Sequence, residues 1–270
     1  MEKTKVLFVS QEITPYLPEN EMSIRGRHLP QGIQERGKEI RTFMPRFGTI
    51  NERRNQLHEV IRLSGMNLII DDTDRPLIIK VASIQSARMQ VYFIDNEDYF
   101  HRKQMLQDEE GHEFEDNDER AIFFARGVLE TVKKLRWAPD VVHCQGWFTG
   151  LVPLYLKKAY KDDPLFADSK VVYSAYNDEF KEPLNSKLKD KVKMEGITAK
   201  DLKAIKDNPD YLNFSKLAIE HSDGVIKGRP ELNKDLDQYI DSLKKPTLDY
   251  KNNDEYIDAY STFYDELLTE

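Results

Sequence analysis

Short runs of consecutive apolar residues recur along the chain, each bounded by polar or turn-forming residues. Such runs are typical of strands that are buried on both faces of a parallel sheet. The runs that predict strands are Val6–Val9, Ile40–Met44, Leu77–Ser83, Gln90–Ile94, Val141–Cys144, Val171–Ala175 and Gly224–Ile226. The first run ends in polar residues, which places hydrogen-bonding side chains at the carboxyl end of the first predicted strand.

The first predicted helix lies between the first two of these strands. Its apolar stripe consists of Met22, Leu29 and Ile33, and Gly37 is placed to end it as a C-cap. Pro30 has no N–H to donate, so it should kink this helix or interrupt it. Strand, helix and strand together predict a βαβ unit with a right-handed crossover at the start of the chain.

Further helices are predicted where apolar residues recur at intervals of three and four. They are Ala121–Leu135, with Asn117 or Asp118 as its cap, then Leu151–Tyr160 and Tyr211–His221. Strands and helices therefore alternate along almost the whole chain. This alternation predicts an α/β fold with a doubly wound, mainly parallel, Rossmann-like sheet.

An aromatic stripe marks the C-terminal end of the sequence. At helical spacing it contains Tyr256, Tyr260, Phe263, Tyr264 and Leu267, and Asn252 to Asp254 precede it as capping candidates. A helix that packs on the domain is favoured over a cofactor-binding surface. We therefore expect one Rossmann-like domain over residues 1–245 and a C-terminal helix within residues 246–270 docked on it.

Two polar stretches separate the predicted elements. Asp95–Asn117 is acidic and rich in turn formers, which predicts a loop or a partly helical excursion. Its carboxylates, between Asp108 and Asp116, could bind a cation, but a solvated acidic loop is the favoured interpretation. Lys187–Asn208 is charged and weakly periodic, so it predicts exposed helical turns, and its lysine run Lys187–Lys193 is expected to be a solvated face.

Composition narrows the class of protein. Of 270 residues, 39% are hydrophobic and 33% are charged, and no stretch approaches the roughly 20 apolar residues of a membrane helix. The formal charge of −8 disfavours a nucleic-acid-binding protein. The residues after Met1 do not form a secretion signal, and the single cysteine, Cys144, suits a reducing compartment. We expect a cytoplasmic protein without a nucleic-acid or membrane partner.

Ligands of open α/β sheets bind beyond the carboxyl ends of the strands. Gln11–Ser23, Cys144–Phe148 and Ala175–Pro183 occupy such positions. No glycine-rich phosphate loop follows the first strand, so no nucleotide cofactor is expected. His143 and Cys144 are adjacent strand residues that point to opposite faces, and no ligand cluster surrounds them, so a buried structural pair is favoured over a metal or nucleophile site.

Several motifs in a fixed order carry a family resemblance. They include Glu12 and Pro15 after the first strand, Met44–Gly48, Tyr92–Asp95, Asp116–Phe124 and Asp140–Leu156. In these segments, and in Asn213–Leu232, the chain resembles glycogen and starch synthases. The resemblance covers most of the chain, and most of the residues that carry it build the fold.

The resemblance implies the N-terminal half of a GT-B fold, in which two Rossmann-like domains close over a cleft. Such synthases transfer glucose from ADP-glucose or UDP-glucose to an α-1,4-glucan with retention of configuration. The chain is long enough for the first of these domains, and the second normally supplies groups that hold the diphosphate and the glucose. The C-terminal aromatic stripe resembles the final helix that GT-B chains return to their first domain.

The sequence departs from the family where the ligands would bind. The family's Lys-Thr-Gly-Gly-Leu corresponds to Pro18–Met22, and its next Gly-Asp to Ser23–Ile24. Its His-Asp-Trp-His corresponds to Gln145–Phe148, and its Thr-x-His-Asn to Ser174–Asn177. A cation, two glycines and an imidazole are thereby lost. No catalytic or metal-binding residue is predicted, and the residues of a vestigial substrate cleft are Glu12, Pro18, Asn20, Gln145, Trp147 and Asn177.

Three functions remain open from the sequence. The first is a glycogen-synthase-like protein that does not transfer glucose alone and binds α-glucan, a nucleotide sugar or a protein of glycogen metabolism. The second is an active transferase, alone or with a partner that supplies the second domain. The third is a scaffold or oligomerisation module, because a fold does not fix a function.

Overall fold

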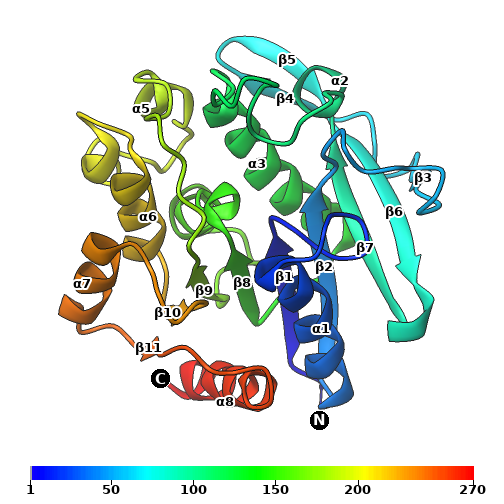
Figure 1. Cartoon of the computed structure of the whole chain (residues 1–270), viewed down its shortest axis with the longest axis vertical. Helices are drawn as coiled ribbons and strands as arrows, with labels where there is room; N and C mark the ends of the chain where they lie inside the picture. The colour runs from blue at the N-terminus through cyan, green and yellow to red at the C-terminus, as the bar shows by residue number, and fades with distance from the viewer. Residues whose placement is uncertain (1) are drawn as a thin grey trace.

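A sheet of nine strands runs through residues 2–270, the part of the chain that the computed structural model describes (Figure 1). Its order is β11-β10-β9-β8-β1-β2-β7-β6-β3, and β4 and β5 form a separate hairpin. The strands are β1 Lys5–Ser10, β2 Glu39–Pro45, β3 His58–Glu59, β4 Asn67–Ile70, β5 Thr73–Pro76, β6 Ile78–Ile84, β7 Met89–Asp95, β8 Val141–Gln145, β9 Lys170–Ala175, β10 Gly224–Lys227 and β11 Thr247–Leu248.

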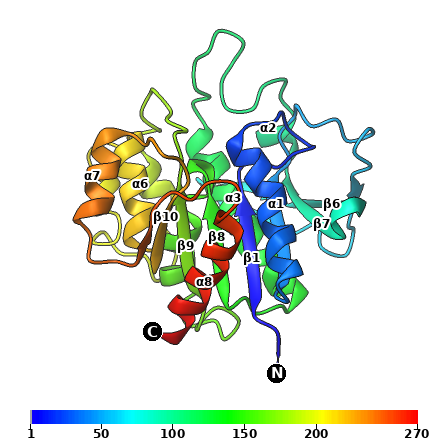
Figure 2. The same cartoon turned by 60° about the horizontal axis from the view of Figure 1, so that its bottom comes forward.

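Helices cover both faces of the large sheet. They are α1 Glu21–Glu35, α2 Glu97–Phe100, α3 Asn117–Leu135, α4 Val152–Leu154, α5 Leu188–Lys191, α6 Tyr211–Glu220, α7 Lys234–Ser242 and α8 Tyr256–Thr269. Side chains of β1 alternate between two apolar cores, because successive residues of a strand point to opposite faces. Val6 and Phe8 pack with α1 and α8, whereas Leu7 and Val9 belong to the core that includes α3 and α6. Figure 2 shows α1 and α8 side by side on one face.

The predicted fold class is confirmed. Seven strands, β11, β10, β9, β8, β1, β2 and β7, are paired in parallel, and β6 and β3 extend the sheet in antiparallel pairing. Every strand predicted from an apolar run is present within two residues of its expected ends. The result is a mainly parallel, Rossmann-like sheet with helices on both faces.

Several local features differ from the expectations. Helix α1 continues through Pro30 without a break, so the proline removes one N–H donor and the helix runs on to Glu35. The hairpin β4–β5 was not predicted; Asp71 and Asp72 turn it with φ values of 48° and 60°. Both backbones lie in the left-handed region that such two-residue turns require, and aspartate tolerates it. The segment predicted as helix Leu151–Tyr160 is a short α-helical turn followed by a π-helix.

The C-terminal aromatic stripe forms helix α8, which packs on the sheet as predicted. Its buried residues join one apolar cluster with β1, β8 and β9. Two polar contacts fix it in place: Tyr264 hydroxyl lies 2.5 Å from His143 Nδ1, and Arg25 Nη1 donates to Tyr260 hydroxyl at 3.0 Å. The helix is therefore held by both apolar packing and buried hydrogen bonds.

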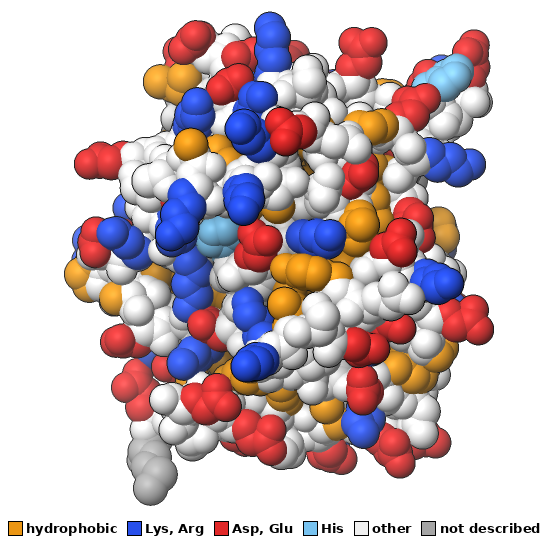
Figure 3. Space-filling view, turned by 90° about the vertical axis from the view of Figure 1, so that its left-hand side faces the viewer, with side chains coloured by type: hydrophobic (Ala, Val, Ile, Leu, Met, Phe, Trp, Pro, Cys, Tyr) orange, Lys and Arg blue, Asp and Glu red, His pale blue; other side chains and the backbone are white. Residues whose placement is uncertain are grey.

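The lysine run Lys187–Lys193 is only partly a solvated face. Lys187 and Lys193 are exposed, but the side chain of Lys191 is 7% exposed and its Nζ lies 3.1 Å from Asp118 Oδ2 on α3. The expectation was therefore wrong for Lys191, which ties the segment after β9 to α3. Lysine and arginine side chains gather on the flank that Figure 3 faces, which is the left-hand side of Figure 1.

Within residues 2–270, no helix combines the length and the apolar character needed to cross a membrane.

Candidate functional site

The carboxyl ends of the parallel strands meet at one edge of the sheet, and two pockets lie there. The larger, about 480 Å³, is here called the aromatic pocket; its lining includes Gln11, Glu12, Pro18, Trp147, Asp178 and Phe180. The smaller, about 380 Å³, is called the amide pocket; its lining includes Glu12, Asn20, Glu21, Asn177, Asp178 and Arg229. Glu12 and Asp178 line both, so the two pockets adjoin at these carboxylates.

Aromatic rings form one wall of the aromatic pocket. The Trp147 and Phe180 rings meet edge to face with centroids 4.7 Å apart, and Phe214 packs against both. Trp147 is only 1% exposed, so this wall is rigid and mostly covered. The apolar surface that a ligand can reach in this pocket comes from Pro18 and the half-buried Met105 and Leu106, beside carboxylates, which suits a ligand with both hydroxyl groups and C–H faces.

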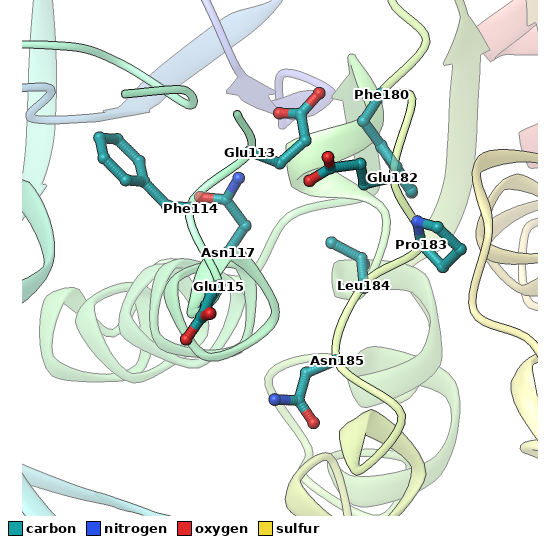
Figure 4. Close-up of a pocket in the computed structure, with 9 residues that line it drawn as sticks. All are labelled: Glu113, Phe114, Glu115, Asn117, Phe180, Glu182, Pro183, Leu184 and Asn185. Atoms are coloured by element: carbon teal, nitrogen blue, oxygen red, sulfur yellow. The ribbon is translucent and has the colours of Figure 1, made fainter. Parts of the chain in front are cut away.

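A third pocket of about 330 Å³ adjoins the aromatic pocket through Glu113 and Phe180 (Figure 4). Glu113 comes from the loop before α3, and Glu182 from the segment after β9. With Glu115 they place three carboxylates around this pocket. Carboxylates therefore line all three pockets.

The turn after β8 depends on Gly146. Its φ of 92° lies in the left-handed region, and a Cβ there would lie 2.8 Å from the Cβ and Oε1 atoms of Gln11. Gln11 Oε1 accepts a hydrogen bond from the Phe148 backbone N–H at 3.0 Å. The absence of a side chain at Gly146 thus lets Gln11 link the ends of β1 and β8, a role that sequence reasoning missed.

Asp178 anchors the aromatic wall and was also missed. Its carboxylate accepts hydrogen bonds from the Trp147 backbone N–H and the Tyr211 hydroxyl, both at 2.7 Å. Burial raises the pKa of Asp178, and the two donors oppose this effect. The sequence offered one weak signal. Asp178 directly follows Asn177, the residue of Ser174–Asn177 that is the same as in the family motif.

Replacing Asp178 with alanine is expected to lower the free energy of unfolding by about 1–3 kcal/mol, because the Trp147 backbone N–H loses its acceptor, whereas the Tyr211 hydroxyl keeps the Tyr176 carbonyl at 2.9 Å. Urea denaturation measures the change. Glu179→Ala is the matched control, since Glu179 is exposed and lines the same pocket. The control should change stability by less than about 0.5 kcal/mol. Equal losses in both variants would contradict the anchoring role of Asp178.

Glu12 is the other shared carboxylate. Asn20 Nδ2 donates to Glu12 Oε1 at 3.3 Å. Burial raises the pKa of Glu12, and the nearby negative charge of Asp178 raises it further. The carboxylates of Glu12 and Asp178 are close enough to interact electrostatically, so they disfavour the binding of an anionic ligand between them.

The structure brings together most of the residues predicted for the cleft. Glu12, Pro18 and Trp147 line the aromatic pocket, and Glu12, Asn20 and Asn177 line the amide pocket. Gln145 lines neither: it is fully buried, its Nε2 donates to Ser10 Oγ at 3.2 Å, and its Oε1 accepts from the Tyr176 hydroxyl at 3.3 Å. Its amide is thus engaged inside the fold and is not presented to a sugar.

His143 and Cys144 are both fully buried, as the sequence predicted. His143 is hydrogen-bonded at both ring nitrogens, and burial raises the pKa of the Cys144 thiol. Among residues 2–270, no group of three or more histidine, cysteine, aspartate or glutamate side chains is arranged to hold a metal ion.

Comparisons with known proteins show which family the chain belongs to. Residues 5–240 match the family model described as the starch synthase catalytic domain. The chain belongs to the glycogen and starch synthase family. It is 36% identical over 220 residues to a glycogen synthase of Chlorobium limicola, a match that covers 81% of this chain and 44% of that protein. It is 39% identical over 174 residues to a glycogen synthase of Chlorobaculum tepidum, covering 64% and 36% respectively.

The chain also has the fold of a solved starch synthase domain. The catalytic domain of starch synthase IV from Arabidopsis thaliana, solved with ADP and acarbose, superposes with a TM-score of 0.75 at 17% identity. The superposition covers 94% of this chain and 53% of that one. The chain thus spans about half the length of the synthases it matches. The segments expected from the sequence to depart from the family pattern, Pro18–Met22, Gln145–Phe148 and Ser174–Asn177, all contribute residues to the two pockets or pack directly beside them.

Proposed function

We propose that this chain is a glycogen-synthase-like protein of α-glucan metabolism that binds neutral glucan in the cleft and does not by itself transfer glucose. One observation carries the proposal. The amide pocket is lined by three carboxylates, Glu12, Glu21 and Asp178, and its lining cation, Arg229, is paired with Glu21. The carboxylates would repel a diphosphate in this pocket, and the cation that lines the pocket is already paired with Glu21.

Neutral sugars face no such repulsion. Hydroxyl groups of a glucan can donate to the carboxylates, and the side chains of Asn20 and Asn177 offer both donors and acceptors. In the aromatic pocket next to it, Pro18, Met105 and Leu106 provide apolar surface for the sugar C–H faces. This combination favours a maltooligosaccharide over a nucleotide sugar as the ligand. The proposal includes a cytoplasmic location and allows a protein partner of glycogen metabolism.

A second candidate is an active glucosyltransferase that works with a partner carrying the other half of the GT-B fold. The resemblance to a starch synthase solved with ADP and acarbose favours it, because those ligands represent a nucleotide and a glucan analogue. In that case the cleft would bind the nucleotide sugar only when the second half is present.

The test combines binding and turnover. Thermal unfolding of the purified chain is measured with maltopentaose, ADP-glucose and UDP-glucose; a ligand selective for the folded state stabilises it by about 2.7 kcal/mol at 100 times its dissociation constant. We expect stabilisation by maltopentaose alone, and no transfer of labelled glucose to glycogen above a heat-inactivated control. Transfer by the chain alone would overturn the proposal, as would stabilisation by the nucleotide sugars but not by maltopentaose.

A further inference from the structure

The carboxylate of Glu21 lies between two guanidinium groups at the start of α1. Its Oε1 lies 3.2 Å from Arg25 Nη2, and its Oε2 accepts a hydrogen bond from Arg229 Nη1. Glu21 and Arg229 both line the amide pocket. In residues 2–270, the ion pairs of Arg25 and of Arg229 are both made with this one carboxylate.

Arg25 is a fixed, buried cation. Its side chain is 1% exposed, Nη2 donates to the Lys251 carbonyl at 2.6 Å, and its guanidinium lies over the Tyr250 and Tyr256 rings, 5.0 and 4.5 Å from their centroids. An arginine cannot shed its charge to relieve burial. The positive charge of Arg25 therefore stays beside Glu21, and a buried cation without an anionic partner is costly.

The start of α1 adds to this positive field. Asn20 caps the helix: its side chain accepts from the Ser23 N–H, and the Ser23 hydroxyl accepts from the Asn20 N–H. Fifteen residues of aligned peptide dipoles place partial positive charge at this end. Glu21, in the first turn, offsets part of the positive charge of this helix start and of the two guanidinium groups.

We propose that Glu21 determines the ligand specificity of the amide pocket by acting as a built-in anion. Its carboxylate occupies the position that Arg25, Arg229 and the helix start would otherwise offer to a phosphate group. Phosphate-bearing ligands are excluded because the Glu21 carboxylate fills the position, and because Glu12 and Asp178 bring the carboxylates to three against two guanidinium groups. This role of Glu21 adds a specificity determinant to the proposed function. It rests on that function only for the claim that the natural ligand is neutral.

The test removes the carboxylate and asks whether an anion takes its place. Binding of inorganic pyrophosphate to the full chain is measured by isothermal titration calorimetry for the wild type, for Glu21→Gln and for Glu19→Gln. Glu19 is the matched control: it is an exposed carboxylate two residues away that does not line the pocket. We expect at least about tenfold tighter binding with Glu21→Gln and less than about twofold change with Glu19→Gln, because charge-assisted contacts need the freed guanidinium groups.

A second substitution localises the effect. Adding Arg229→Gln to Glu21→Gln should remove most of the gained affinity. Similar gains in Glu19→Gln and Glu21→Gln would show a general charge effect and overturn the proposal, as would no gain with Glu21→Gln. If Glu21→Gln does not fold, Glu21→Asp, which draws the carboxylate back by one methylene, replaces it: tighter pyrophosphate binding than in the wild type supports the proposal and equal binding rejects it.

The maltopentaose measurement on the wild type keeps the two proposals separate. Failure of maltopentaose to bind removes the proposed function but does not alter the pyrophosphate comparison. Failure of the Glu21 variants to gain affinity removes this inference and leaves glucan binding intact.

Discussion

Deletion of residues 252–270 is expected to lower the free energy of unfolding by more than about 5 kcal/mol, which is close to the whole stability of many domains. The deleted segment contains α8, whose five large buried side chains cover one face of the sheet over β1, β8 and β9. Burying one such side chain contributes about 1.5–3 kcal/mol. Guanidinium denaturation of the shortened chain, or its failure to show a cooperative transition, measures the effect.

Two adjacent leucines of α8 provide matched variants that leave the helix in place. Leu267 is 1% exposed and lies in the apolar cluster under the helix, whereas Leu268 is 36% exposed. Leu267→Ala should cost about 2–4 kcal/mol because it opens a cavity, and Leu268→Ala less than about 0.5 kcal/mol. The difference between the two isolates packing from helix propensity.

The same deletion tests the scaffold hypothesis. If α8 were chiefly an oligomerisation surface, removing it would change the assembly state measured by light scattering and leave the transition midpoint near that of the wild type. Its tyrosines are instead turned inward: Tyr260 and Tyr264 are both fully buried and hydrogen-bonded inside the chain. We therefore expect loss of stability as the main result.

Periodic patterns were sufficient to predict the sheet, the main helices and the docking of α8. Buried parallel strands read as continuous apolar runs, and amphipathic helices as stripes, so both leave a local signal. Some of the missed elements leave little signal: β3 and β11 are two residues long, and the β4–β5 turn uses two aspartates where glycine or asparagine is more usual. Helix α7 was also missed, although its buried residues Leu236 and Ile240 have helical spacing.

The candidate site was only partly predictable, because its decisive contacts join residues far apart in the sequence. Glu21 pairs with Arg229, 208 positions away, and Arg25 reaches Tyr260, 235 positions away. No local pattern encodes such pairs. Gln145 shows the converse: its position after a buried strand suggested a ligand contact, but the neighbouring Ser10 and Tyr176 occupy its amide.

Acid should weaken the chain through His143. This imidazole is fully buried; Nδ1 lies 2.5 Å from the Tyr264 hydroxyl and Nε2 lies 2.6 Å from Ser174 Oγ. Burial lowers the pKa of His143 to about 3 from a usual value near 6.5. Between pH 6.5 and pH 3, His143 is therefore protonated in the unfolded chain but neutral in the folded chain. This contribution to stability is fully present above pH 6.5 and is lost as the pH falls towards 3.

The slope approaches about 1.4 kcal/mol per pH unit below pH 6, so the expected loss between pH 6.5 and pH 4.5 is about 2 kcal/mol. Buried carboxylates such as Asp118, whose pKa burial raises, act in the opposite direction, so the contribution of His143 must be read as a difference between variants. His143→Gln should cost about 1–3 kcal/mol at pH 7, since buried hydrogen bonds are disturbed. Its stability should then fall less steeply with acid than that of the wild type, by about 2 kcal/mol over the same interval.

Urea denaturation of both proteins at pH 6.5, 5.5 and 4.5 provides the comparison. His112→Gln, at an exposed position in the loop before α3, is the matched control and should follow the wild type within about 0.5 kcal/mol at each pH. Parallel pH profiles for the wild type and His143→Gln would mean that the folded chain accepts the proton at His143. In that case the contact between β8 and α8 would tolerate a charged imidazolium. The hydrogen bonds of a neutral His143 to Ser174 and Tyr264 would then not be required to hold α8 in place.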